Sequence, residues 1–164
     1  NQLRRYFLET DCQYMLHLES DIFPPVDVLE QLLWSRKPIV NALYQVFDGS
    51  WRTPCIAIND QKHELHREYV FHATLDNFWH WFIDGSVKQT FIAGIGCSLM
   101  KRKVLEKFSF RYNPDEMKPP DTWFAEDLRS AGVQNWVNTG VLCYHHNKED
   151  WGRHFEYVDY HKSE

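Results

Sequence analysis

One stretch decides the fold of this chain: Tyr14-Met15-Leu16-His17-Leu18-Glu19-Ser20-Asp21-Ile22-Phe23-Pro24-Pro25. Its apolar first half, within residues 13–18, predicts a buried strand, and its closing prolines predict the start of a helix over about residues 26–35. Glu19 and Asp21 thus follow the carboxyl end of a strand, which is where open α/β sheets bind ligands. Because side chains alternate along a strand, we expect both carboxylates to point the same way.

Outward from this stretch, strand-like and helix-like segments alternate along the chain. Residues 48–86 are an exception, since Pro54 and many aromatic residues predict a loop-rich excursion with one or two short strands. Alternating strands and helices predict an α/β fold, with a mixed sheet flanked by helices, in a single domain over residues 1–164. The other predicted strands are 38–44, 90–100 and 135–144, and the other predicted helices are 1–10, 101–108 and 122–131, the last capped by Asp121 and ended by Gly132.

The composition is that of a globular protein, with 43% hydrophobic and 25% charged residues. The formal net charge of −5 argues against a nucleic-acid-binding surface, which requires an excess of basic residues. No apolar run approaches the roughly 20 residues of a transmembrane helix, and no secretory signal is visible. The four cysteines form no C-x-x-C pair, which predicts no zinc ribbon and a reduced, cytoplasmic setting: Cys12, Cys55, Cys97 and Cys143.

Two carboxylates at a strand end form a hard oxygen site suited to Mg²⁺ or Mn²⁺. Such an ion can bind the diphosphate of a nucleotide-sugar and stabilise the charge that develops on the leaving group. Acid-x-acid triplets are common and are more often two exposed acids before a turn, so Glu19 and Asp21 alone are weak evidence for a metal site.

The same stretch, followed by Val28-Leu29-Glu30-Gln31-Leu32-Leu33, resembles the DxD segment of family-2-like GT-A glycosyltransferases. The resemblance implies a GT-A-like, Rossmann-like fold, with Asp21 as a metal ligand and Glu19 as a second ligand or a contact of the nucleotide-sugar. It extends from about residue 2 to residue 146. GT-A domains normally open with a strand–loop–helix unit that holds the nucleotide, and nothing here resembles it. We therefore expect the metal- and acceptor-binding portion of such a domain, incomplete at its N-terminus.

A second segment of the chain resembles the GT-A pattern G-x-G-C-x-L: Phe91-Ile92-Ala93-Gly94-Ile95-Gly96-Cys97-Ser98-Leu99. The resemblance implies that Gly94 and Gly96 lie beside the donor sugar. Taken alone, two glycines in a strand more often indicate a bulge. The third glycine of a dinucleotide-binding fingerprint is absent. The basic residues after this segment, Lys101, Arg102 and Lys103, either reach phosphate or solvate the start of the next helix.

A third segment, Trp123-Phe124-Ala125-Glu126-Asp127-Leu128, resembles the E-D motif on the acceptor-side helix of inverting GT-A enzymes. The resemblance implies Asp127 as the base that deprotonates the acceptor hydroxyl, Glu126 as the residue that orients the acceptor, and Trp123 as a contact of the bound donor. The alternative is that both acids only favour an early helix turn electrostatically.

The last predicted strand ends in Thr139-Gly140-Val141-Leu142-Cys143-Tyr144-His145. In several GT-A families a histidine at this place completes the metal site, so the resemblance implies His145 as a third ligand beside Asp21 and Glu19. A separate zinc site at His63 and His66 is not expected, because their H-x-x-H spacing is one residue short of H-E-x-x-H.

The sequence thus predicts a metal-dependent glycosyltransferase, expected to be inverting, that moves a sugar from a nucleoside-diphosphate sugar to an acceptor hydroxyl with Mn²⁺ or Mg²⁺. One alternative is a non-catalytic carbohydrate-binding or interaction module derived from a GT-A domain. Another is a nucleotidyltransferase, which also uses an acidic metal site on an α/β sheet.

Overall fold

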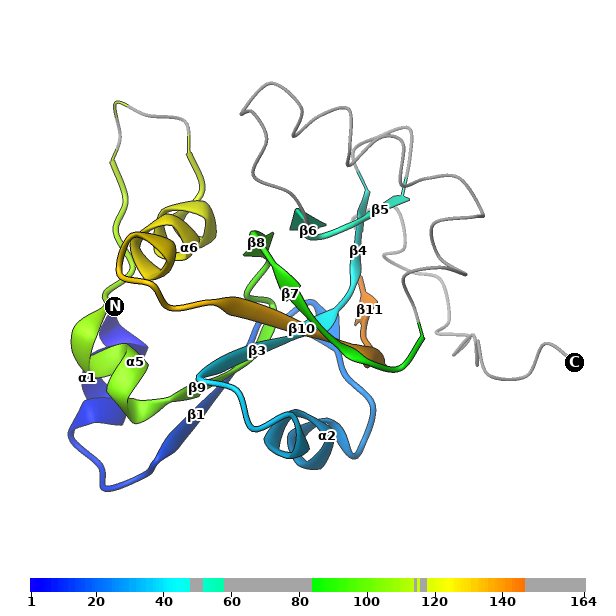
Figure 1. The fold of residues 1–164 in the computed structure, drawn as a ribbon, viewed down its shortest axis with the longest axis horizontal. Coiled ribbons are helices and arrows are strands. Elements are labelled where there is room, and N and C mark those ends of the chain that lie inside the picture. Colours follow the sequence, from blue (N-terminus) through cyan, green and yellow to red (C-terminus); the bar gives the residue numbers. More distant parts are fainter. Residues whose placement is uncertain (48–51, 58–83, 114, 116–117, 147–164) are drawn as a thin grey trace, which may run out of the picture.

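The computed structural model describes residues 1–47, 52–57, 84–113, 115 and 118–146. A five-stranded mixed sheet forms its centre (Figure 1), in which β3 and β10 are parallel and the other neighbours are antiparallel. This arrangement confirms the predicted α/β class with a mixed sheet between helices. The strand order is β1 (Tyr14–Leu18), β9 (Cys97–Lys101), β3 (Ile39–Leu43), β10 (Asn135–Leu142) and β7 (Val87–Thr90).

Helices α2 (Val28–Trp34) and α6 (Pro120–Ser130) cover opposite faces of this sheet (Figure 1). Strand β3 is buried along its whole length, so its side chains alternate between the two helical layers. Val40 packs in the cluster beneath α2, whereas Ile39 packs with residues of α6. Four of its five residues are apolar, as expected for a strand covered on both faces.

Three two-stranded pairings extend the sheet at one end. β4 (Gln45–Phe47) pairs with β5 (Arg52–Pro54), and β6 (Ile56–Ala57) pairs with β8 (Ile92–Ala93). β2 (Ile22–Phe23) pairs antiparallel with β11 (Tyr144–His145), which places His145 opposite Ile22. This last pairing joins the acidic stretch near the start of the chain to the histidine near the end of the described part.

Two predicted strands are shorter in the structure. The predicted strand 90–100 is interrupted at Gly94–Gly96, where the chain leaves β8 and turns before β9. The predicted strand 135–144 ends at Leu142, and Cys143 separates it from β11. Both breaks lie beside the buried ring of Tyr44, which the strand pattern alone does not reveal.

The start of α6 also differs from the prediction. Pro119 is the N-cap and Pro120 the first helical residue, so Asp121 lies inside the first turn instead of capping the helix. Gly132 ends the helix as expected, with a φ of 72°, and the Val133 amide donates to the Leu128 carbonyl at 2.9 Å.

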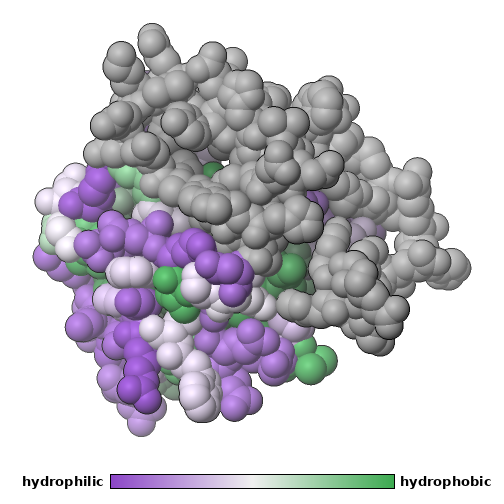
Figure 2. All heavy atoms as spheres, turned by 45° about the vertical axis from the view of Figure 1, so that its right-hand side comes forward, coloured by the Kyte–Doolittle hydropathy of each residue, from purple (hydrophilic) through white to green (hydrophobic). Residues whose placement is uncertain are grey.

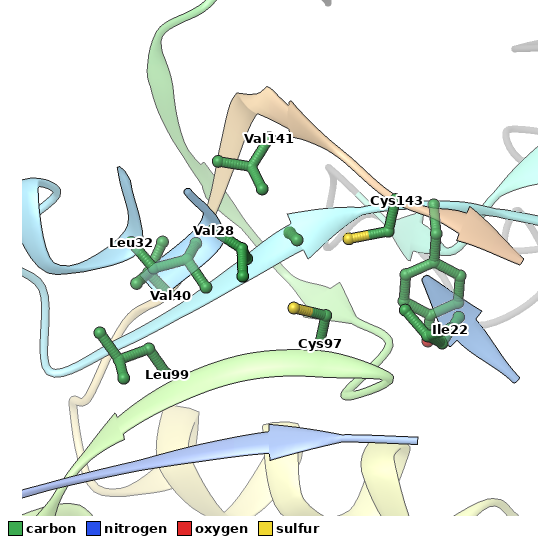
Figure 3. Close-up of a cluster of buried hydrophobic side chains, with 10 residues drawn as sticks. Ile22, Val28, Leu32, Val40, Cys97, Leu99, Val141 and Cys143 are labelled. Carbon is green, nitrogen blue, oxygen red and sulfur yellow. The ribbon is translucent and has the colours of Figure 1, made fainter. Parts of the chain in front are cut away.

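The core on the α2 side is built from aliphatic residues, one tyrosine and two cysteines (Figure 3). The thiols of Cys97 and Cys143 share a hydrogen bond, which lowers the pKa of Cys97 and raises that of Cys143. Neither cysteine forms a disulfide in the structure. The buried residues of this cluster are Ile22, Val28, Leu32, Val40, Ala42, Tyr44, Cys97, Leu99, Val141 and Cys143.

On the other side, α1 (Gln2–Leu8) and α5 (Arg102–Lys107) cap each other's carboxyl ends. Arg4 of α1 donates to the carbonyls of Leu105 and Phe108 at 2.6 and 2.9 Å. Arg102 at the start of α5 donates in return to carbonyls at the end of α1 and just beyond it, including that of Cys12 at 2.8 Å. Charged donors at a helix C-terminus satisfy its unpaired carbonyls. Arg102 therefore has a structural role, and its side chain is not available to reach phosphate.

A buried polar cluster crosses the middle of the sheet. The Asn41 amide on β3 donates to Asn135 Oδ1 at 2.7 Å and to the Trp136 carbonyl at 2.8 Å, both on β10. Ser98 on β9 donates to Asn41 Oδ1. Asn41 is fully buried, so each of these bonds compensates for a group removed from water. The cluster links three adjacent strands and favours a single register between them.

The described surface is largely hydrophilic on the face shown in Figure 2, with isolated hydrophobic residues. Over the residues that the structure describes, no helix is long and apolar enough to cross a membrane. His63 and His66, where no zinc site is expected, lie outside the described residues.

Candidate functional site

A turn, and not strand alternation, positions the two acids of the first motif. Strand β1 ends at Leu18, and Ser20 and Asp21 form a turn in which the Ile22 amide donates to the Glu19 carbonyl at 3.2 Å. Glu19 and Asp21 therefore do not lie on one strand, so the alternation from which we expected both carboxylates to point the same way does not apply. The pairing of β2 with β11, which no local pattern indicates, decides where Asp21 lies.

Asp21 and His145 lie side by side. The Asp21 Oδ2 atom is 3.4 Å from the His145 Nε2 atom, and the His146 amide donates to the Asp21 carbonyl at 2.8 Å. The Asp21 side chain is 49% exposed, so an ion in solution can reach it. His145 Nδ1 lies 3.0 Å from the Gln45 carbonyl oxygen. Because a carbonyl only accepts, Nδ1 carries the proton there and Nε2 faces Asp21 with its lone pair or, in the imidazolium, a second proton.

The donor set fits a divalent cation in part. Two atoms that share one octahedral ion at about 2.1 Å lie about 3.0 Å apart, close to the separation of Asp21 Oδ2 and His145 Nε2. A second-shell carbonyl on the other ring nitrogen, here from Gln45, is usual for ligating histidines. Among the described residues no group of three His, Cys, Asp or Glu side chains is arranged to hold an ion. A bound ion would take its remaining ligands from water or substrate phosphate, as Mg²⁺ commonly does.

Glu19 lies near Asp21 and His145, and its backbone is hydrogen-bonded to the segment Gly94–Gly96. Its amide donates to the Gly96 carbonyl at 2.8 Å. Although the residue is solvent-exposed, its carboxyl group is partly desolvated, which raises its pKa. The charges of Asp21 and Asp121 raise the pKa of Glu19 further, whereas His17 and His145 lower it. Three carboxylates thus share one electrostatic environment, a common feature of functional sites.

Gly94 and Gly96 make room for Tyr44. A Cβ atom on Gly94 would lie 2.1 Å from Tyr44 Oη and 2.4 Å from Cys55 Sγ, and one on Gly96 would lie 2.9 Å from Tyr44 Cζ. The Gly96 amide donates to Tyr44 Oη at 3.2 Å. The glycines are thus required by packing, and their contact with a donor sugar stays a prediction.

The sequence interpretation missed Tyr44, whose ring links the glycine segment to the metal-site candidate. Its centroid is 5.7 Å from that of the His145 ring. Burial raises the pKa of the Tyr44 phenol, and burial also raises that of the neighbouring Cys55 to about 11. Tyr44 ends a predicted strand and precedes Gln45, but no sequence signal distinguishes it from an ordinary core tyrosine.

The acids of the E-D motif are paired with cations from the loop before α6. Lys118 donates to both carboxylate oxygens of Glu126, at 3.0 and 2.9 Å. Arg111 binds Asp127 in a two-point contact at 2.9 and 2.8 Å.

The Trp123 ring contacts the same two cations. The Arg111 and Lys118 groups are 3.7 and 3.9 Å from the centre of its ring. Its indole nitrogen is buried and has no hydrogen-bond partner among the described residues. The structure therefore places Trp123, Glu126 and Asp127 in one charged cluster. Their contact with a donor or acceptor stays a prediction.

No protein-family model matches this chain, and no curated protein matches it in sequence. Its fold is similar to that of the crystal structure of A197 from STIV, with a TM-score of 0.55 and 16% sequence identity. The match covers 89% of this chain and 64% of that protein, so this chain spans less than two thirds of the length of A197. At this identity the similarity supports the mixed α/β fold and nothing about activity.

Proposed function

We propose that this chain is the metal- and acceptor-binding part of a GT-A glycosyltransferase that uses a nucleoside-diphosphate sugar and Mn²⁺ or Mg²⁺. The observation that supports it is the contact of Asp21 with His145, together with the Gln45 carbonyl that orients the imidazole. The order of three further motifs along the chain is the second support. In this proposal Asp21 and His145 bind the ion, and Glu19 contacts the ion through water or the ribose of the donor.

When bound, the divalent ion would stabilise the negative charge that appears on the departing nucleoside diphosphate. Residues of the chain position the two ligands proposed for this ion. The Gln45 carbonyl fixes the ring orientation of His145, and the pairing of β2 with β11 holds Asp21 beside it. The pKa of Glu19 is raised first by burial and then by the charges of Asp21 and Asp121, and a divalent cation would offset the effect of those charges.

Calorimetric titration tests this proposal. A panel of UDP-, GDP- and ADP-sugars is titrated into the protein with and without Mn²⁺. We expect Mn²⁺-dependent binding by the wild type and a loss of at least about 10-fold in affinity for Asp21→Asn and for His145→Gln. Asp27→Asn is the matched control, because Asp27 is an exposed acid at the start of α2 with no side-chain bond to the helix.

Two other outcomes separate the alternatives. If the wild type binds no nucleotide-sugar in a metal-dependent way, the proposal is wrong, and a non-catalytic carbohydrate-binding or interaction module is the better description. Release of pyrophosphate, and not of a nucleoside diphosphate, would instead indicate a nucleotidyltransferase.

A further inference from the structure

Helix α6 carries three acids, and only one of them lies on its inward face. Asp121, Phe124, Ala125 and Leu128 have the spacing of one helical stripe, i, i+3, i+4 and i+7. The exposed fraction of Phe124, Ala125 and Leu128 is 3% or less. Asp121 is therefore directed toward the body of the protein. At about 100° per residue, Glu126 and Asp127 lie about 140° and 120° away from Asp121 around the helix axis.

Along the helix, Asp121 precedes the three apolar residues of this stripe. It lies in the first turn of α6, about 10 Å along the axis from Leu128. The helix packs on β8, which leads directly into the Gly94–Gly96 segment that binds the Glu19 amide. Burial raises the pKa of both Glu19 and Cys55, and the negative charge of Asp121 adds to each shift.

The Asp121 carboxylate makes hydrogen bonds with its neighbour Thr122. Its Oδ1 atom accepts from the Thr122 amide at 2.7 Å and from the Thr122 hydroxyl at 3.5 Å. Among the described residues no lysine, arginine or histidine pairs with it. Lys118 contacts both carboxylate oxygens of Glu126, and Arg111 contacts both of those of Asp127, so each of these two acids already holds a cation.

We propose that Asp121, and not Asp127, is the base that deprotonates the acceptor, an inference that rests on the glycosyltransferase function proposed above. The acceptor hydroxyl gives its proton to the Asp121 carboxylate as its oxygen forms a bond to the anomeric carbon of the donor. The bond from that carbon to the diphosphate oxygen breaks, and its electron pair leaves with the nucleoside diphosphate. Glu126 and Asp127 then hold the loop before α6 in place through Lys118 and Arg111.

The test compares Asp121→Asn with Asp127→Asn, using the nucleoside-diphosphate sugar that binds most tightly in the titration above. Asn at position 121 can still accept the Thr122 amide bond, so the helix start is retained. Turnover is measured as nucleoside diphosphate released with water as acceptor and again with sodium azide. Azide is an anionic nucleophile that has no proton to lose, so it needs no base.

We expect Asp121→Asn to lower kcat by at least about 100-fold with unchanged affinity for the donor, and azide to restore it. We expect Asp127→Asn to stay within about threefold of wild type. The inference is overturned if Asp121→Asn keeps its activity, if azide does not restore the lost rate, or if the azide-dependent loss appears in Asp127→Asn. It is also overturned if the wild type binds the donor but releases no nucleoside diphosphate. Absence of metal-dependent donor binding by the wild type would instead refute the proposed function.

Discussion

His145 Nε2 lies 3.4 Å from Asp21 Oδ2, although the two residues come from opposite ends of the described chain. The pairing of β2 with β11 brings them together, because His145 is opposite Ile22, the residue after Asp21. The Gln45 carbonyl then sets which ring nitrogen faces the carboxylate. The candidate metal site therefore depends on two short strands and on the first residue of a third.

Glu19→Gln is expected to stabilise the protein at neutral pH. The pKa of Glu19 is raised in the folded state above its usual value of 4.5, so the folded protein binds this proton more tightly than the unfolded chain. Stability then falls as pH rises through 4.5 and above, and ionised Glu19 is unfavourable at pH 7. Thermal unfolding should give a higher Tm for the variant at pH 7 and a smaller difference at pH 4. A lower Tm at pH 7 would contradict a pKa of Glu19 raised by burial and by the neighbouring charges.

Arg102→Met should weaken the contact between α1 and α5. The variant keeps most of the apolar length of the side chain but loses the charged bonds to carbonyls at the end of α1. We expect the free energy of unfolding in urea to fall by about 2 kcal/mol. Lys103→Met is the control, since Lys103 is exposed, and it should change stability by less than about 0.5 kcal/mol. Equal effects of the two changes would show that the capping bonds contribute nothing.

Asn41→Leu should be among the most destabilising single changes in the sheet. It leaves the Trp136 carbonyl and the Ser98 hydroxyl without their buried partner. The expected loss is about 3 kcal/mol in the free energy of unfolding, against about 1 kcal/mol for Ser98→Ala, which removes a single bond. The double variant should show strong non-additivity. Stability within about 0.5 kcal/mol of wild type for Asn41→Leu would refute a role for the cluster.

Gly94→Ala is expected to destabilise the protein by about 2 kcal/mol through overpacking against Tyr44 and Cys55. Adding Tyr44→Phe removes the hydroxyl that the new methyl group meets first, so the double variant should recover part of the loss. Chemical denaturation of the four proteins in this double-mutant cycle measures the coupling. Absence of coupling would mean that the glycine is not required by the tyrosine ring.

The local sequence predicts the main elements well. The apolar residues of 13–18 and 38–44 form β1 and β3, and Gly132 ends the last helix. These features follow from side-chain periodicity and from the backbone freedom of glycine, which act within a few residues. The same periodicity places Asp121 on the helix face of Phe124 and Leu128. The sequence interpretation instead assigned Asp121 to the N-cap, outside the helix.

Strand 90–100 was less predictable, because its break depends on a ring from a distant part of the chain. Tyr44 fills the space at Gly94 and Gly96 and turns the chain there. Glu126 and Asp127 form ion pairs with Lys118 and Arg111 of the preceding loop. The E-D motif alone does not reveal these ion pairs.

By itself, then, the sequence determined the α/β class, the order of its elements and the chemical types of the candidate site residues, because these depend on local spacing. Local spacing does not bring Asp21 to His145, which the resemblance alone predicted, and only the tertiary structure shows how strand pairing does so. Only the tertiary structure decided that Glu126 and Asp127 are bound by cations and that Asp121 faces inward. Those relationships depend on strand pairing and on the packing of α6, which bring together residues that are distant along the chain.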